Sequence, residues 1–197
     1  MPTQEERRAA TRAAVIEAAM RLFGETGFEK VRVGDIAAEA GVAKGAVYHH
    51  FPTKEAIFEA VFEEVAASLA RSLVSGAKRA ADPLDAIIAG VRGYFKACSE
   101  GPTRQIILKD GPAILGWARW RELDQRHFGG TIPQAIELAM GQGIVAQQPL
   151  DPLSRLIVGA VTEGAMVVAT SNAPSAEIRR YLQAFRELLY GLKVDRN

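Results

Sequence analysis

The stretch Val33–Phe51, with the sequence VGDIAAEAGVAKGAVYHHF, decides the fold of the N-terminal part of this chain. The spacing of its apolar residues predicts two short helices, over 33–40 and 44–50, joined by a tight turn. The apolar side chains expected to bury the inner face of this helix pair are Ile36, Val42 and Val47.

Small residues stand where the geometry of such a pair requires them. Ala37 is small where the two helices cross, and Gly41 lies where the turn requires a positive φ, which glycine adopts at little cost. Counted from Val33, Ala37, Gly41 and Val47 occupy positions five, nine and fifteen. This spacing is typical of a helix-turn-helix, whose second helix enters the major groove of DNA. It also fits an ordinary hairpin in a helical bundle, so the spacing alone leaves both interpretations open.

The residues around this frame extend it into a longer pattern. From Gly27 to Lys54 the sequence reads GF(x)7IAxxAGVxKGxxYxHFxxK. Over about residues 8–60 it resembles the N-terminal DNA-binding domain of the tetracycline-repressor (TetR) family of bacterial transcription regulators. That resemblance implies that the remaining chain is a helical domain that senses a ligand and forms a dimer.

The resemblance also implies DNA-binding roles around the second helix of the pair. The positions expected to contact base edges or to lie against the groove are Lys44, Gly45 and Ala46. The positions expected to contact phosphates are Tyr48, His49, His50 and Lys54. Each of these four side chains can donate a hydrogen bond to a phosphate, and Lys54 stands near the start of a helix, where the dipole favours an anion. Phe51 is expected in the core.

Two candidate DNA-binding residues depart from the family pattern. Arg32 lies where the family usually has Thr or Ser before the first helix of the pair, and it is either a longer phosphate contact or a plain solvated arginine. Ala43 stands where a Ser usually caps the recognition helix. A missing cap costs about 1 kcal/mol of local stability, so we expect a looser recognition helix in the free protein.

The rest of the chain predicts an all-α fold of about nine helices. Apolar residues recur at helical spacing in every long segment, and Gly and Pro separate the segments. The first helix is expected over 5–25, with Gly27 as its stop, and a long helix begins near Thr53, whose side chain can cap it. We predict a helix-turn-helix domain over 1–54 and a ligand-sensing and dimerisation domain over 55–197.

The composition predicts a soluble, cytoplasmic protein that does not enter a membrane. The 197 residues are 48% hydrophobic, and 24 Lys and Arg nearly balance 23 Asp and Glu, which excludes a polybasic protein and an acidic disordered chain.

Residues 1–54 contain eight basic and seven acidic side chains, so their net charge is +1. A single domain of this charge is expected to bind DNA weakly, and affinity must come from two domains on one duplex.

The last two predicted helices, 151–171 and 175–191, are expected to form a homodimer interface. The first is apolar nearly all round and contains small residues that allow close helix approach, and the second is amphipathic. These features also fit a buried helix beside an amphipathic neighbour, and the family resemblance favours a four-helix interface between two subunits. The candidate interface residues are Leu156, Ala160, Val161, Ile178, Tyr181, Leu182, Phe185 and Leu189.

The middle of the chain, residues 83–147, is where an effector is expected to bind. It combines large apolar side chains with Gly and Pro breaks. No charge cluster in residues 83–170 suggests a phosphate or dicarboxylate site, so we expect a small, largely apolar effector. Trp117 and Trp120 are three residues apart and should be neighbours on one helical face. The candidate pocket residues are Phe95, Ile107, Leu115, Trp117, Trp120, His127 and Met166.

Two other classes of function compete with a DNA-binding regulator. The sequence has no nucleophile elbow, no phosphate-binding glycine loop and no metal-ligand spacing, and its single Cys98 lies in an apolar segment, so we expect no enzyme, cofactor or metal. The alternative is a helical interaction module that uses the hairpin to contact proteins. The expected partners of a regulator are double-stranded operator DNA, a second copy of the chain and a small-molecule effector.

Overall fold

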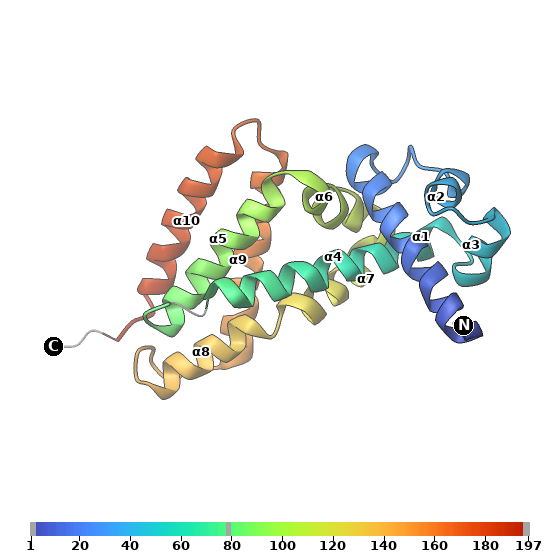
Figure 1. The fold of residues 1–197 in the computed structure, drawn as a ribbon. Helices are drawn as coiled ribbons and strands as arrows, with labels where there is room; N and C mark the ends of the chain where they lie inside the picture. Colours follow the sequence, from blue (N-terminus) through green and yellow to red (C-terminus); the bar gives the residue numbers. More distant parts are fainter. Residues whose placement is uncertain (1–2, 78–79, 195–197) are drawn as a thin grey trace. The chain divides into compact units, whose positions relative to one another are not determined.

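The computed structural model describes residues 3–77 and 80–194, and the predicted all-α fold is confirmed there (Figure 1). The N-terminal helices are α1 (Gln4–Thr26), α2 (Val33–Glu39), α3 (Lys44–His50) and α4 (Lys54–Ala77). They are followed by α5 (Pro83–Ser99), α6 (Gly101–Thr103), the π-helix η1 (Arg104–Asp110), α7 (Gly111–Phe128), α8 (Thr131–Gly141), α9 (Leu150–Thr170) and α10 (Pro174–Tyr190). The only β-type pairing among the described residues is an isolated bridge between Val145 and Lys193.

The ends of the N-terminal helices follow from local chemistry that is visible in the sequence. Gly27 ends α1 with a φ of 83°, and Gly41 makes the turn between α2 and α3 with a φ of 67°, so both glycine predictions are confirmed. The Thr53 hydroxyl accepts a hydrogen bond of 3.1 Å from the backbone N–H of Ala56. Thr53 therefore caps α4, as the sequence predicts.

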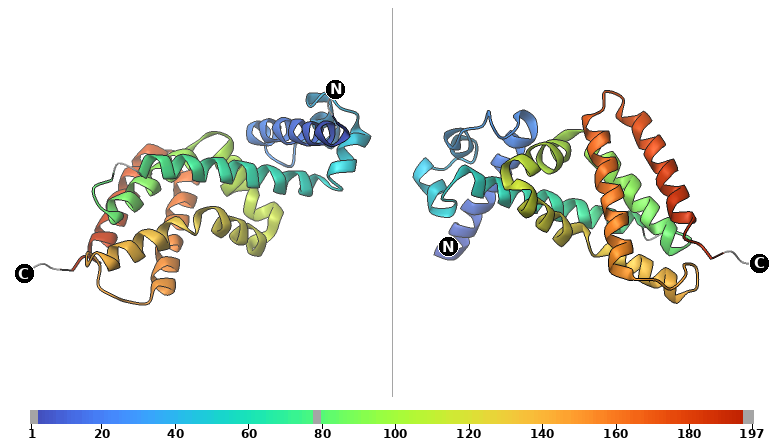
Figure 2. Two further views of the ribbon diagram at one scale, coloured as in Figure 1. Left: turned by 60° about the horizontal axis from the view of Figure 1, so that its bottom comes forward. Right: turned by 180° about the vertical axis from the view of Figure 1, so that it is seen from behind.

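The chain packs as two compact units, each built from two separate stretches of the sequence. One unit contains the residues up to Ala66 together with Gly101–Trp120, and the other contains Ala67–Glu100 together with the residues from Arg121 onward. Hence α6, η1 and the first part of α7 pack with the helix-turn-helix, since α1 contacts both α6 and η1. The two views of Figure 2 show α1 beside these segments.

Aromatic side chains fill the core of the first unit. The rings of Phe23, Phe28 and Phe58 lie 5.3–5.5 Å apart between centroids. Trp120 is fully buried, and its indole N–H donates a hydrogen bond of 2.8 Å to the carbonyl oxygen of Ile107. These contacts join α1 and α4, and α7 to η1, within this unit.

The second unit contains α5, α8, α9 and α10. Helices α5 and α9 contact each other, and each of them also contacts α8 and α10. Helix α9 approaches its neighbours closely at Gly164, where a Cβ atom would lie 2.6 Å from the Phe95 ring and 3.1 Å from that of Tyr181. Helix α9 is the one described helix that is long and apolar enough to cross a membrane, and 39% of its apolar stretch is buried inside the protein. Much of its surface thus lies outside the core of the unit.

Candidate functional site

The outer face of α3 presents the side chains that the sequence predicts to bind DNA. Lys44, Gly45 and His49 are exposed, and Tyr48 is 46% exposed, whereas Val47 on the opposite face is fully buried. The Lys44 ammonium lies 6.0 Å from the centre of the Tyr48 ring. Because Val47 packs into the core, the polar face of α3 lies at the surface.

Gly45 adds no side chain to this exposed face of α3. A Cβ atom at Gly45 would meet nothing within 4 Å, so the fold does not require glycine there. Ala46 beside it is half-buried and Ala43 before it is exposed, so this end of α3 carries little side-chain bulk. Because the side chains here are small, the backbone at the N-terminal end of α3 can approach another surface closely.

The helix ends around α2 and α3 confirm one expectation about capping. Ala43 makes no side-chain cap at the start of α3. Arg32 is exposed directly before α2, and its backbone N–H donates a hydrogen bond of 2.9 Å to Oδ2 of Asp35. The Arg32 side chain is therefore at the surface beside the helix pair.

His50 lies half-buried at the end of α3, next to basic residues of α1. Burial first, and then the positive charges of Arg8, Arg12 and His49, lower the pKa of His50 below its usual value. His50 is therefore neutral at pH 7 and has one N–H to donate. The Arg12 guanidinium stacks over the ring of Phe51, 5.3 Å from its centre, and Phe51 is buried as expected.

Lys54 makes structural contacts that the sequence did not reveal. Its ammonium donates hydrogen bonds to the carbonyl oxygens of Phe28 (3.0 Å) and Val31 (3.1 Å), and it lies 3.9 Å from the centre of the Phe28 ring. Two of its three N–H groups are thus used within the protein. These contacts give Lys54 a structural role in holding the loop between α1 and α2, and a phosphate contact through its third N–H stays a prediction.

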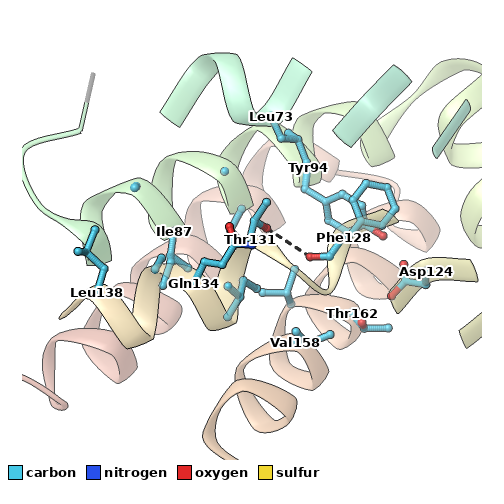
Figure 3. A pocket seen from close by; sticks show the side chains of 16 residues that line it. Leu73, Ile87, Tyr94, Asp124, Phe128, Thr131, Gln134, Leu138, Val158 and Thr162 are labelled. Atoms are coloured by element: carbon cyan, nitrogen blue, oxygen red, sulfur yellow. Dashed lines mark hydrogen bonds between the residues drawn. The ribbon is translucent and has the colours of Figure 1, made fainter. Parts of the chain in front are cut away.

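A cavity of about 340 Å³ lies inside the second unit (Figure 3). Its wall is largely aliphatic and aromatic, with a few hydroxyl and amide groups and one carboxylate. The lining residues are Leu73, Ala86, Ile87, Gly90, Val91, Tyr94, Asp124, Phe128, Thr131, Ile132, Gln134, Ala135, Leu138, Val158, Val161 and Thr162. Its size lies at the lower end of the range found for small-molecule sites.

None of the seven pocket residues expected from the sequence lines this cavity. Phe95, Ile107 and Trp120 are buried in the cores, and Trp117 is 59% exposed. The two tryptophans are neighbours as predicted, with ring centroids 5.0 Å apart, but both belong to the first unit. The half-buried residues that also lie outside the cavity wall are Leu115, His127 and Met166. The wall is formed by other residues, including the aromatic Tyr94 and Phe128, because helix packing decides which apolar side chains fill a core and which border a cavity.

The exposed surface of α9 and α10 differs in part from the interface expected from the sequence. Val161, Phe185 and Leu189 are buried within the subunit, so they cannot be primary contacts to a partner. Leu156 is 73% exposed and Leu188 is 52% exposed. The candidates that are half-buried are Ala160, Ile178, Tyr181 and Leu182.

The described part of the chain contains no group of three or more His, Cys, Asp or Glu side chains that could hold a metal ion. Cys98 is buried, and burial raises the pKa of its thiol to about 12. This thiol is therefore protonated at pH 7 and unreactive.

Two family models match the chain. Residues 15–61 match "Bacterial regulatory proteins, tetR family", and residues 84–192 match "Tetracyclin repressor-like, C-terminal domain". The second match covers more than half of the chain.

Curated relatives and solved structures agree with these matches. The A-factor receptor protein of Streptomyces griseus is 25% identical over 89% of this chain and 61% of its own length, and the regulator BetI of Rhizobium meliloti is 32% identical over 46% of this chain and 45% of its own length. The chain therefore spans about half to three-fifths of these two relatives. A TetR-family transcriptional regulator from Pectobacterium atrosepticum has a TM-score of 0.86 at 29% identity, with both chains covered completely. RolR in complex with resorcinol has a TM-score of 0.75 at 18% identity, over 94% of this chain and 90% of that one.

Proposed function

Because the chain belongs to the TetR family of transcriptional regulators, which are DNA-binding proteins and not enzymes, we propose that it is a ligand-responsive repressor. In this proposal it binds a palindromic operator as a homodimer in the cytoplasm, and a small, largely apolar effector releases it. The single observation that carries the proposal is the exposed polar face of α3, with Lys44, Gly45 and Tyr48 on a helix anchored by the buried Val47.

Each recognition helix is proposed to read one half-site in the major groove. Lys44 and the backbone at Gly45 and Ala46 would lie nearest the base edges. The groups proposed to contact phosphates are Arg32, Tyr48, His49 and His50. So few contacts, in an N-terminal region of net charge +1, give weak binding to one subunit, so the operator must engage two recognition helices together.

The proposed dimer surface is the exposed side of α9 and α10. The 73% exposed Leu156 and the 52% exposed Leu188 are large apolar side chains that water would otherwise contact. Ala160, Tyr181 and Leu182 are half-buried on the same two helices and complete the surface. Stable homodimers of this kind bury more than about 2,000 Å² in total, which two helices from each subunit can supply.

The cavity of the second unit is the proposed effector site. Its mostly apolar wall suits a small apolar molecule, and the structurally similar RolR has resorcinol, a small aromatic compound, as its ligand. An effector releases DNA only if it binds the arrangement that cannot hold DNA more tightly than the one that can. A hundredfold preference shifts this equilibrium by about 2.7 kcal/mol. We expect α4 to transmit the change, because its residues belong to both units.

Fluorescence anisotropy with the DNA upstream of the protein's own gene tests the proposal. We expect saturable binding that weakens as salt rises and competes poorly with unrelated DNA. Lys44→Ala should change the order of preference among operator variants, since a base contact is lost. If the protein binds all duplexes equally, or if Lys44→Ala leaves the order unchanged, the assigned recognition face is wrong and a protein-binding module becomes the better interpretation.

A further inference from the structure

One carboxylate interrupts the apolar wall of the cavity. Asp124 lies at the end of the cavity that is opposite Leu138, on the side of Phe128 and Thr162 (Figure 3). Its side chain is on the last turns of α7, and the residue is only 7% exposed. Among the described residues no hydrogen bond to this carboxylate is found, and the charge that acts on it is that of Arg121.

The groups that surround Asp124 do not neutralise it. On α5, Tyr94 and Cys98 face it, and burial raises the pKa of both, so they are uncharged at pH 7. On α7, Arg121 is one turn earlier and attracts the carboxylate, but burial outweighs this attraction and raises the pKa of Asp124 to about 6. The polar residues of α8 and α9 in the cavity wall are Thr131, Gln134 and Thr162, which carry no charge.

A carboxylate that is buried without a partner is costly to the protein, because ionisation in an apolar environment requires a compensating charge or hydrogen bonds. A ligand bound in the cavity could supply this partner, because Asp124 is part of the cavity wall. Two aromatic rings stand beside it. Tyr94 and Phe128 both line the cavity, with centroids 5.3 Å apart and planes inclined at 61°. Aromatic faces attract organic cations that are removed from water.

The Thr131 hydroxyl already donates its hydrogen within the protein. It donates a hydrogen bond of 3.3 Å to the carbonyl oxygen of Phe128, in the same turn (Figure 3). Because it is the one carboxylic acid among the described residues of the cavity wall, Asp124 is the strongest hydrogen-bond acceptor that the cavity offers to an incoming molecule. An anion would be repelled by it, and a neutral hydrocarbon would leave it unpaired.

On the premise that this cavity is the effector site of the proposed function, we propose that it selects organic ammonium ions: small apolar molecules whose single N–H-bearing cation pairs with the carboxylate of Asp124, beside the rings of Tyr94 and Phe128. The apolar body of the ligand fills the rest of the cavity towards Leu138. The specificity of the site therefore comes from one charge, and its affinity from apolar contact.

Two probes of nearly equal shape test this proposal by calorimetry on the full chain. They are 1-naphthylmethylamine, which is a cation at pH 7.5, and 1-naphthylmethanol, which is neutral. The amine should bind wild-type protein at least tenfold more tightly than the alcohol. Asp124→Asn should remove this preference and leave the affinity for the alcohol unchanged. Glu163→Gln, which removes one negative charge at an exposed position of α9, is the matched control and should behave as the wild type.

The pH dependence separates a charge pair from a simple hydrogen bond. Binding of the amine requires ionised Asp124, so its Kd should rise about tenfold for each pH unit below 6, whereas the Kd of the alcohol should stay constant. The proposal is overturned if the alcohol binds as tightly as the amine, if Asp124→Asn keeps the preference, or if neither probe binds.

A second measurement keeps this proposal distinct from the proposed function. Operator binding is followed by anisotropy while each probe is added. If the amine binds in an Asp124-dependent manner but operator affinity does not change, the ligand class is right and the sensing role fails. If only the alcohol binds and releases DNA, the sensing role holds and selection of cations is wrong.

Discussion

The backbone N–H of Phe28 donates a hydrogen bond of 2.8 Å to Oδ2 of Asp110, across 82 positions of the sequence. The other carboxylate oxygen of Asp110 accepts a hydrogen bond of 2.9 Å from the side-chain amide of Gln105. The last residue of the π-helix η1 thereby holds the loop that follows α1. π-helical turns are rare and frequently occur at functional positions, and here one presents the acceptor that fixes the start of the helix-turn-helix.

Removing this acceptor should loosen the first unit. Asp110→Ala leaves the N–H of Phe28 without its charged partner, and we expect the free energy of unfolding to fall by about 1.5–3 kcal/mol. Urea denaturation measures this change. Lys109→Ala alters the exposed neighbour on the same helix and should change stability by less than about 0.5 kcal/mol. Equal effects of the two substitutions would show that the contact is not important for stability.

Lys54 should affect stability more than DNA binding. Lys54→Met keeps the apolar stem but removes the donor to Phe28 and Val31, so the free energy of unfolding should fall by about 1–2 kcal/mol. The salt dependence of operator binding should stay as in the wild type, since no phosphate contact is lost. Lys30→Met, at an exposed position of the same loop, controls for the change in charge. A flatter salt dependence with unchanged stability would support the phosphate role of Lys54.

A substitution at Gly45 should have opposite effects on the stability of the protein and on its affinity for DNA. Because a Cβ atom there meets open space, Gly45→Ala should raise the stability of the free protein by up to about 1 kcal/mol through helix propensity. The same methyl group should lower operator affinity at least tenfold if the backbone lies against the DNA. Gly34→Ala in α2, where a Cβ atom also meets nothing within 4 Å, should stabilise without loss of affinity. Unchanged affinity of Gly45→Ala would remove this residue from the interface.

Charges on the exposed face of α9 and α10 should disrupt the dimer but not the subunit. Leu156→Glu combined with Leu188→Glu should give a folded monomer at micromolar concentration in sedimentation velocity, because neither side chain belongs to the core. Leu138→Glu, at a leucine of α8 that is similarly exposed, should leave the dimer intact. If the Leu138 variant dissociates instead, the interface lies elsewhere.

The raised pKa of Asp124 predicts an unusual dependence of the free energy of unfolding on pH. Its pKa of about 6 in the folded protein lies above the ordinary value of 3.8, so the ionised form destabilises the folded state above pH 6, and this penalty disappears as pH falls towards 4. Asp124→Asn should therefore be more stable than the wild type by up to about 3 kcal/mol at pH 7.5. The difference should shrink as pH falls from 6 and be lost below the ordinary pKa of 3.8 in thermal or urea unfolding. A difference that does not depend on pH would contradict the buried, ionisable character of this carboxylate.

The sequence by itself determined the helices and the helix-turn-helix. Their limits depend on neighbouring residues: Gly27 and Gly41 supply positive φ angles, Thr53 caps α4, and the regular spacing of Ile36 and Val47 marks a buried face. The absence of a cap at Ala43 followed equally from the sequence alone. Such features act over a few residues, so they can be recognised before the fold is known.

Only the tertiary structure decided what each buried or polar side chain contacts. Helical periodicity shows that Phe185 and Leu189 face inward, but not whether the apolar surface opposite belongs to the same subunit or to another. Likewise, Lys54 and Asp110 form hydrogen bonds with backbone groups 23 to 82 positions away, and the cavity forms where α4, α5, α7, α8 and α9 surround unfilled space beside Asp124. These outcomes depend on how the helices pack against each other, because packing decides which apolar side chains fill the core and which groups surround each polar side chain.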